Sequence, residues 1–327
     1  MWMKVFRSIA SIDVQDDSCL TMGVFDGIHL GHQRLLRRVV DIARARGIVP
    51  FVLTFDPHPE AVLSPNGGPP LLTTVEEKLA LFREFGIKAV AVLPFDKGLA
   101  QTSARDFARR ILIGKLHVAH MVVGIEATFG KGAHGTTSML VNLGDELGFK
   151  VEVLEQVVLD NLVVSSTAIR TAILAGELEK AARMLGRPYR LTGTVISGAG
   201  RGKGLGFPTA NIKPPADKAM PPDGVYACAV SIDSDTANLK MDIDGDAEEH
   251  AAVVYIGTRP TFGGGERLIE AHLWEQSLEL TGKNIGIYFI SRLRGDITFA
   301  NKEALVQQMA VDAQQAFELL SQYYSSR

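Results

Sequence analysis

The sequence contains very little cysteine. Only two of its 327 residues are cysteines, Cys19 and Cys228, and each lies within an apolar run far from the other. Two such residues cannot supply a disulfide framework or a cysteine-rich zinc site. They are expected to be buried free thiols in a reducing compartment, which favours a cytoplasmic location.

The sequence also lacks a large net charge and any long apolar segment. The formal net charge is -3 and no block of Lys or Arg occurs, which argues against nucleic acid as a partner. No apolar run is long enough for a membrane-spanning helix, and acidic residues near the N-terminus argue against a signal peptide. The length is typical of a globular protein with two domains. We expect no membrane partner. The sequence leaves the oligomeric state open, and a homo-oligomer is possible.

The first half of the chain alternates short apolar runs with amphipathic patterns of helical period. This order predicts an α/β fold with a doubly wound parallel sheet, which binds ligands beyond the carboxyl ends of its strands. Thr74 with Glu77, and Ser103 with Asp106, have the spacing of capping boxes at helix starts. Strands are expected near 19–24, 49–55, 89–93, 121–123 and 151–154, and helices near 33–46, 75–85, 104–112, 138–147, 167–174 and 178–185.

A Gly-Arg-Pro sequence at residues 186–188 interrupts this order. The chain then continues as short β-like runs separated by turns, and it ends in an amphipathic helical pattern near 302–323. This texture predicts a small antiparallel β-barrel with a C-terminal helix. We therefore expect an N-terminal domain over residues 1–186 and a C-terminal domain over 187–327. Strands of the second domain are expected near 191–196, 225–232, 252–256, 268–273 and 285–290.

A turn between the first long strand and the first helix carries two histidines. Residues 23–32 read GVFDGIHLGH, which fits neither the dinucleotide-binding nor the Walker pattern. Glycines in such a turn let the backbone approach a ligand, and the following helix N-terminus favours phosphate. His29 and His32 can contact the same phosphate and stabilise charge that develops on it during displacement. Isolated structural histidines are the alternative.

A second motif, SSTAIR at residues 165–170, also lies at a strand-to-helix transition. Its hydroxyl groups can cap the helix, which alone would be a sufficient structural reason for them. Three hydroxyls followed by Arg170 can also form a phosphate cradle, because guanidinium groups bind phosphate oxygens in pairs. Because the sequence also contains the histidine turn, we favour phosphate binding over helix capping alone as the role of this motif.

Together the two motifs resemble those of the HxGH nucleotidyltransferases. With TFDPHP at 54–59 and Phe-Gly at 129–130, they resemble the adenylyltransferase half of the prokaryotic bifunctional riboflavin kinase/FAD synthetase family. The resemblance implies that FMN attacks the α-phosphorus of ATP and releases pyrophosphate, with Mg²⁺ sharing the charge. It implies catalytic roles for His29 and His32, nucleotide contacts for Gly23, Phe25, Asp26, Gly27, Ser165, Ser166, Thr167 and Arg170, and flavin contacts for Asp56 and His58.

The chain departs from the family pattern at two places. Members usually follow Gly124 with an acidic residue, then Asp or Asn, then Phe, whereas this chain has Ile125, Glu126 and Ala127. Val163 stands where members usually have Arg ahead of the Ser-Ser-Thr run. These changes predict weaker adenylylation. They leave a second hypothesis, in which the N-terminal domain serves only in nucleotide or flavin binding or in regulation, beside an active kinase.

A glycine-rich segment opens the second half of the chain. Residues 198–206 alternate glycine with other residues, among them Arg201 and Lys203, and such a loop offers N–H groups and positive charge to a polyphosphate. A flexible linker is the alternative. Thr209 and Asn211 follow in an extended segment, where alternate side chains share a face. A hydroxyl and an amide oxygen can ligate a hard cation such as Mg²⁺ beside phosphate oxygens.

Residues 204–211, GLGFPTAN, and 256–263, IGTRPTFG, resemble the riboflavin kinase signature. The resemblance implies that Glu270 is the general base that takes the proton of the riboflavin 5′-hydroxyl as it attacks the γ-phosphorus of ATP. A cross-strand ion pair is the alternative role for Glu270. The resemblance also implies ATP contacts for Gly200, Lys203 and Gly206, a metal site at Thr209 and Asn211, and flavin contacts for Arg294 and Phe299.

The resemblance spans nearly the whole chain, with both halves in the order of the family. We therefore expect a cytoplasmic enzyme that phosphorylates riboflavin to FMN and adenylylates FMN to FAD. ATP, riboflavin and FMN are its expected small-molecule partners. A nucleotidyltransferase for another small phosphate, fused to a ligand-binding barrel, is the less favoured hypothesis.

Overall fold

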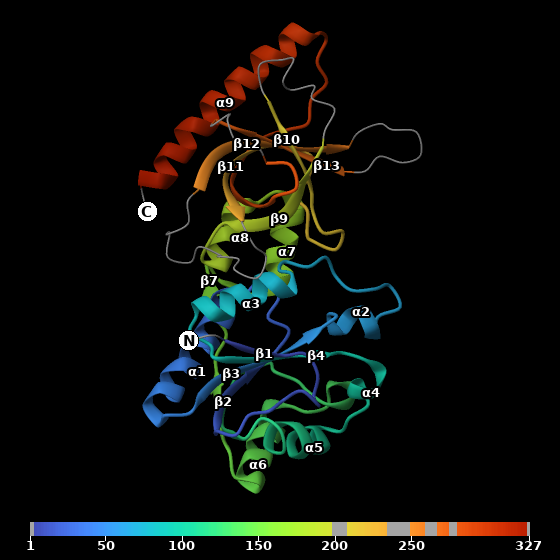
Figure 1. The fold of residues 1–327 in the computed structure, drawn as a ribbon, viewed down its shortest axis with the longest axis vertical. Helices are drawn as coiled ribbons and strands as arrows, with labels where there is room; N and C mark the ends of the chain where they lie inside the picture. The colour runs from blue at the N-terminus through green and yellow to red at the C-terminus, as the bar shows by residue number, and fades with distance from the viewer. Residues whose placement is uncertain (1–2, 198–207, 234–248, 259–266, 275–279, 326–327) are drawn as a thin grey trace. The chain divides into compact units, whose positions relative to one another are not determined.

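The structure is a computed structural model that describes residues 3–197, 208–233, 249–258, 267–274 and 280–325 (Figure 1). Contacts divide the chain into two compact units. The first contains residues 1–69 and 73–165, and the second contains residues 70–72 and 166–327. Each unit has the fold that the sequence predicts, a wound parallel sheet in the first and a closed antiparallel barrel in the second.

The first unit is built on a six-stranded parallel sheet with the strand order β1-β4-β3-β2-β5-β6. The order reverses between β2 and β5, because the chain first winds from β2 towards β4 and then returns to the other side of β2. Crevices at such reversals are the usual ligand sites of parallel sheets. The strands are β1 (Lys4–Phe6), β2 (Ser18–Met22), β3 (Val49–Asp56), β4 (Ala89–Pro94), β5 (Val118–Gly124) and β6 (Lys150–Leu154).

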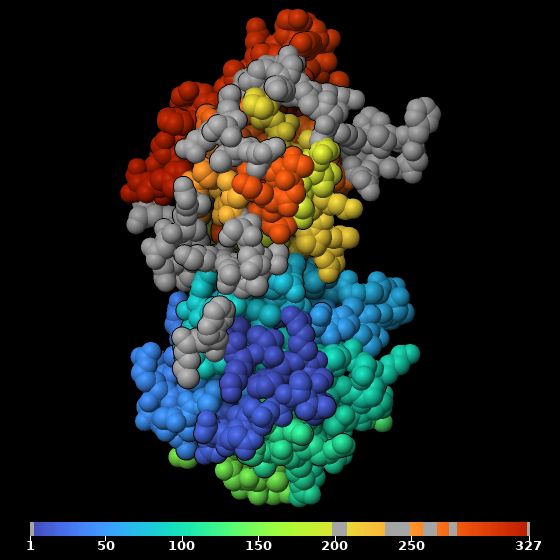
Figure 2. Space-filling model, viewed as in Figure 1, coloured from blue at the N-terminus to red at the C-terminus, as the bar shows by residue number. Residues whose placement is uncertain are grey.

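Helices cover the sheet and bury its central strands. Leu20, Phe51 and Met121, from β2, β3 and β5, are fully buried in one core cluster. The segment that begins at residue 3, dark blue in Figure 2, lies at the surface of this unit, in keeping with the edge position of β1. The helices are α1 (Leu30–Arg46), α2 (Pro59–Leu63), α3 (Val75–Glu84), α4 (Lys97–Ala100), α5 (Ala104–Phe107), the π-helix η1 (Ala108–Ile113), the 3-10 turn η2 (Lys131–Ala133) and α6 (Thr137–Leu147), followed by the hairpin β7 (Val158–Leu159) and β8 (Leu162–Val163).

The two predicted helix starts differ in detail. The capping box at Thr74 and Glu77 is complete, with both reciprocal hydrogen bonds formed. At the second start, Ser103 accepts the N–H of Asp106 at 3.0 Å, but the Asp106 carboxylate accepts the Ser103 hydroxyl at 2.6 Å instead of its backbone N–H. This helix is α-helical for four residues only and continues as η1, so the expected helix at 104–112 is wrong in type over its second half.

The second unit consists of two helices, a barrel and a long C-terminal helix. The barrel closes in the order β10-β13-β12-β11-β14-β9, and all of its neighbouring strands pair antiparallel. Ile212, Ile256 and Ile269 lie in one cross-strand row and are almost fully buried. The elements are α7 (Ser166–Ala175), α8 (Leu178–Leu185), β9 (Tyr189–Ile196), β10 (Ala210–Lys213), β11 (Gly224–Asp233), β12 (Glu249–Thr258), β13 (Arg267–Leu273), β14 (Asn284–Gly295) and α9 (Lys302–Ser325).

Helix α9 lies along the outside of the barrel (Figure 1). Its Ala316 and Leu320 pack against Ala227 of β11. Within the described residues, none of the helices combines the length and the apolar character needed to span a bilayer. Both cysteines are buried free thiols, as predicted, and burial raises the pKa of Cys19 to about 12.

Candidate active sites

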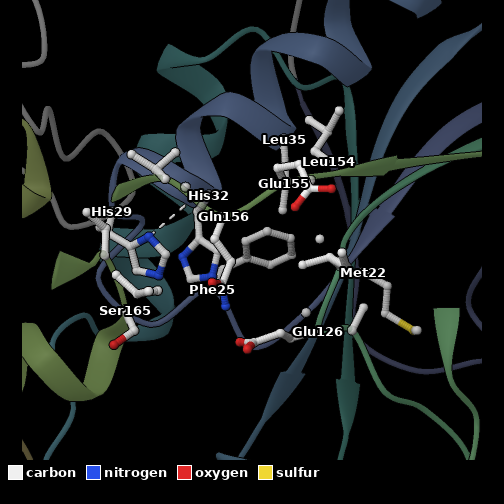
Figure 3. A pocket seen from close by; sticks show the side chains of 18 residues that line it. Met22, Phe25, His29, His32, Leu35, Glu126, Leu154, Glu155, Gln156 and Ser165 are labelled. Carbon is white, nitrogen blue, oxygen red and sulfur yellow. Dashed lines mark hydrogen bonds between the residues drawn. The ribbon is translucent and has the colours of Figure 1, made fainter. Parts of the chain in front are cut away.

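The first site is a cavity of about 270 Å³ in the first unit. It lies beyond the carboxyl ends of β2 and β5, where the strand order reverses, and is therefore at the place that the topology favours for a ligand. The histidine turn forms one wall and the loop after β5 forms another (Figure 3). Residues around it include Met22, Gly23, Phe25, His29, His32, Glu126 and Ser165.

His29 is the N-cap residue of α1. Its Nδ1 accepts the backbone N–H of His32 at 3.4 Å, so Nδ1 is unprotonated and the proton of the neutral ring must lie on Nε2. The helix begins at Leu30, three residues before the predicted start at residue 33, so both imidazoles belong to the helix N-terminus. The positive end of the helix dipole favours an anion here.

The two imidazole rings stack on each other. Their centroids are 3.7 Å apart with an interplanar angle of 21° (Figure 3). Burial, followed by the charges of His29 and Lys78, holds the pKa of His32 well below its ordinary value. His32 is therefore neutral at neutral pH, and its buried Nδ1 has no hydrogen-bond partner. Gly31 makes the stacking geometry available, because a Cβ there would lie 3.1 Å from the His29 ring.

The loop that precedes the two histidines is fixed by hydrogen bonds to Thr73, which lies in a distant part of the sequence. Asp26 is 2% exposed, and its carboxylate accepts the backbone N–H of Thr73 at 3.0 Å. The Thr73 hydroxyl in turn accepts the N–H of Gly27 at 2.9 Å. Phe25 and Gly27 both adopt positive φ, at 54° and 81°, so the loop backbone is sharply turned. Asp26 thus binds the protein's own main chain, and Thr73 is a supporting residue that the sequence did not reveal.

The buried Lys78 also lies beneath this loop. Its Nζ donates to the carbonyl oxygen of Val24 at 3.3 Å. Burial lowers the pKa of Lys78, while the carboxylates of Asp26 and Asp56 partly offset the shift. The ammonium group of Lys78 adds to the positive potential around the loop.

The Ser-Ser-Thr-x-x-Arg motif is divided between the two units. Ser165 contributes to the cavity of the first unit, whereas Ser166 begins α7 in the second. Thr167 is exposed on that helix. Arg170 donates from Nε to the carbonyl oxygen of Pro70 at 2.7 Å, also within the second unit.

The two residues predicted to contact flavin lie after β3. Asp56 is exposed at the end of the strand, and His58 caps α2 by accepting the N–H of Glu60 on its Nδ1 at 3.2 Å. Neither belongs to the walls of the 270 Å³ cavity.

The second site lies on the barrel, where Glu270 is central to a row of polar side chains. Asn211 of β10 and Tyr255 of β12 are its direct cross-strand neighbours on either side. Burial, followed by the charge and hydrogen bond of Asp296 and then by the charges of Asp223 and Glu270, raises the pKa of Tyr255. Asn211 is 6% exposed, so its amide is a largely desolvated group beside a carboxylate.

The other predicted residues of the second half have varied surroundings. Arg294 forms a bidentate ion pair with Asp312 of α9, and its guanidinium lies 5.7 Å from the centroid of the Phe299 ring. Gly200, Lys203 and Gly206 lie outside the described residues, so their ATP contacts stay predictions.

Comparison with known proteins addresses both halves of the chain. The FAD synthetase family model matches residues 11–168, and the riboflavin kinase model matches residues 185–320. The bifunctional riboflavin kinase/FMN adenylyltransferase of Escherichia coli K12 is 32% identical and aligns over 95% of this chain and 96% of its own. That of Bacillus subtilis is 34% identical, with 94% of each chain covered. The chain belongs to the bifunctional riboflavin kinase/FMN adenylyltransferase family.

A solved structure agrees over both units. The crystal structure of a macrolide-efflux protein from Streptococcus pneumoniae is 28% identical, with a TM-score of 0.83, and the match covers 96% of this chain and 98% of that one. The predicted family and fold are therefore confirmed, and the chain has both activities of its family, riboflavin kinase and FMN adenylyltransferase.

The positions that depart from the family pattern gather around the cavity of the first unit. Ile125, Glu126 and Ala127 form the loop after β5, and Val163 ends the β7–β8 hairpin. The side chain of Glu126 is exposed and therefore accessible to a molecule in the cavity. The departures thus lie in the wall of this cavity.

Sequence reasoning missed residues that act on the main chain. Thr73 precedes a recognisable capping box, but nothing local indicates that it binds a loop 46 residues away. His272 shares a face with Glu270 through the two-residue period of a strand, and that period was a usable signal. Among the described residues, no cluster of three or more His, Cys, Asp or Glu side chains could hold a metal ion.

Proposed function

We propose that residues 187–327 phosphorylate riboflavin to FMN and that residues 1–186 adenylylate FMN to FAD, both with magnesium ATP. The observation that carries the proposal is the match of two family models in tandem over nearly the whole chain. The FAD synthetase model lies wholly before this boundary, and the riboflavin kinase model lies after it except for its first two residues, 185 and 186.

In the adenylyltransferase half, we assign His29 and His32 to the phosphates of ATP. With Nδ1 committed to the helix, His29 presents Nε2–H as a donor to a phosphate oxygen. His32, neutral before ATP binds, can gain positive character as negative charge arrives on the phosphate oxygens. No covalent enzyme intermediate is needed, because FMN attacks the α-phosphorus directly and pyrophosphate leaves. Gly23, Phe25, Gly27, Ser165, Ser166, Thr167 and Arg170 are assigned to ATP, Asp26 to support of the loop, and Asp56 and His58 to the flavin side.

In the kinase half, Glu270 is assigned as the general base for the 5′-hydroxyl of riboflavin. Thr209 and Asn211 fit a hard cation, since both offer neutral oxygen donors. Asn211 is also paired with Glu270 on the neighbouring strand. Magnesium, when bound with ATP, would neutralise charge that develops on the transferred phosphoryl group. Arg294 and Phe299 are assigned to the flavin side, and Gly200, Lys203 and Gly206 to ATP.

The location proposed for the enzyme is the cytoplasm. Two buried free thiols are compatible with a reducing compartment, and ATP as co-substrate is available there.

Product analysis tests both steps in one preparation. Glu270→Ala should reduce FMN formation from riboflavin by a factor on the order of 10² to 10⁴, while FMN supplied externally is still converted to FAD. His29→Ala should have the opposite pattern. Glu303→Ala removes an exposed carboxylate from α9 and serves as the matched control.

Chromatography of riboflavin, FMN and FAD gives the readout. Near-parental FMN formation by Glu270→Ala would refute the role of Glu270. Absence of FAD from the parent chain, given FMN and magnesium ATP, would mean that the N-terminal domain only binds its ligands.

A further inference from the structure

His272 lies two residues beyond Glu270 on β13 and makes a buried contact with the main chain. Its Nδ1 is 2.9 Å from the carbonyl oxygen of Pro208, and the residue is 8% exposed. Because a carbonyl oxygen can only accept, Nδ1 carries a proton and donates. The side chain therefore holds the main chain immediately ahead of Thr209.

The segment just before β10 has no ladder hydrogen bonds to β13 to hold it, so the His272 contact fixes its position. The ladder between β10 and β13 begins one residue after Thr209, and Pro208 has no N–H to extend it. Continuing the register by one residue puts Thr209 opposite His272, next to the pair formed by Asn211 and Glu270. Alternate residues share a face, so these four side chains form one block on the barrel.

We propose that His272 is a positioning residue of the kinase site. Its Nδ1–H holds the Pro208 carbonyl and thereby sets Thr209 and Asn211 beside Glu270 for a magnesium nucleotide. The inference rests on the proposed kinase function and metal site. His272 acts through the main chain and does not contact substrate.

Three substitutions separate the hydrogen bond from the ring. His272→Asn keeps an N–H at the position of Nδ1, because in both residues that nitrogen is bonded to Cγ. His272→Gln places its N–H one bond further from Cβ, and His272→Ala removes it. All three variants lose the imidazole ring, whose centroid lies 6.5 Å from that of the Trp274 ring. His250→Ala, on β12 of the same barrel, is the matched control.

Calorimetric titration of ADP into the full-length protein, with Mg²⁺ or with EDTA, gives a readout that does not depend on turnover. Loss of a hydrogen bond worth about 1 kcal/mol corresponds to about fivefold weaker binding. We expect His272→Ala and His272→Gln to weaken ADP binding about fivefold in Mg²⁺ and to leave it unchanged in EDTA. His272→Asn should restore the ADP affinity in Mg²⁺. The KM for magnesium ATP in the kinase assay should rise in the variants that bind ADP more weakly. FAD formation from FMN should not change in any of them.

Two results would overturn the inference. One is unchanged ADP affinity in Mg²⁺ for all variants, even if their melting temperature falls. The other is His272→Asn behaving like His272→Ala. Thr209→Ala and Asn211→Ala distinguish the failures: if they leave the Mg²⁺ dependence intact, the metal site and the inference both fall. If they weaken it and His272→Ala does not, the inference alone falls, and loss of kinase activity in the parent chain would remove the proposed function itself.

Discussion

The ion pair between Arg294 and Asp312 should be the principal polar attachment of α9 to the barrel. Both carboxylate oxygens of Asp312 accept from the guanidinium, at 2.7 to 3.1 Å, and Gln308 donates to the same carboxylate at 2.9 Å. The side chains are 4% exposed for Asp312 and 19% for Arg294. Removing one partner of a buried pair costs about 3 to 5 kcal/mol, because the other charge stays buried.

The structure places the expected cost of Asp312→Ala near the lower end, at about 3 kcal/mol. Arg294 would keep its bond to the Gly295 carbonyl at 3.0 Å and its contact with the Phe299 ring, and it is partly exposed to water. The double variant Arg294→Met with Asp312→Leu should recover most of that loss, since two apolar side chains leave no buried charge.

Urea unfolding followed by the fluorescence of Trp274 measures this cost. Trp274 packs against Phe317 of α9, with ring centroids 6.3 Å apart, so its emission reports on the attachment of the helix. A Trp2→Phe background removes the other tryptophan. A loss below about 1 kcal/mol for Asp312→Ala, or strict additivity of the two substitutions, would refute the reasoning, because an exposed pair behaves in that way.

Two further predictions concern the adenylyltransferase cavity and the barrel wall. Because the pKa of His32 is lowered in the folded state, the unfolded chain binds more protons below about pH 6.5, and stability should fall with acid by up to about 1.4 kcal/mol per pH unit. Urea titrations from pH 5 to 8 should show this slope and a smaller one for His32→Asn; equal slopes would contradict the pKa shift. Gly193→Ala should destabilise the barrel by about 1 to 3 kcal/mol, because the new Cβ would clash with the Ile212 side chain and lie 2.8 Å from the Lys213 carbonyl oxygen. Gly282→Ala is the control, because a φ of +82° is unfavourable for Ala but nothing lies within 4 Å of the new Cβ, and it should cost about 1 kcal/mol. Thermal melts of the two variants measure this difference, and equal melting temperatures would contradict the clash.

The order and type of most elements could be predicted from the sequence because burial imposes their pattern. Central strands such as β3 and β4 are covered on both faces, so they read as continuous apolar runs. The barrel strands are separated by turn residues, and their closure follows from the need to leave no open edge. The edge strand β1 has three residues, two of them exposed, and therefore gave no such signal.

Errors arose where a residue has a role unusual for its type. The predicted start of α1 is three residues too late because its N-cap is His29, whereas Ser, Thr, Asp and Asn are the usual N-cap residues. The change to a π-helix at Ala108 could not be predicted, because π-helices are rare and this one has only six residues, too few to establish a period of its own.

The residues around each site divide into those that can face a ligand and those that hold the main chain. A motif contains both kinds in succession: Asp26 binds Thr73, whereas His29, three residues later, lines the cavity. The Asp26–Thr73 bond spans 47 residues, and no local pattern encodes a contact of that range. A motif therefore locates a site in the sequence, but the division of labour within it follows from tertiary contacts.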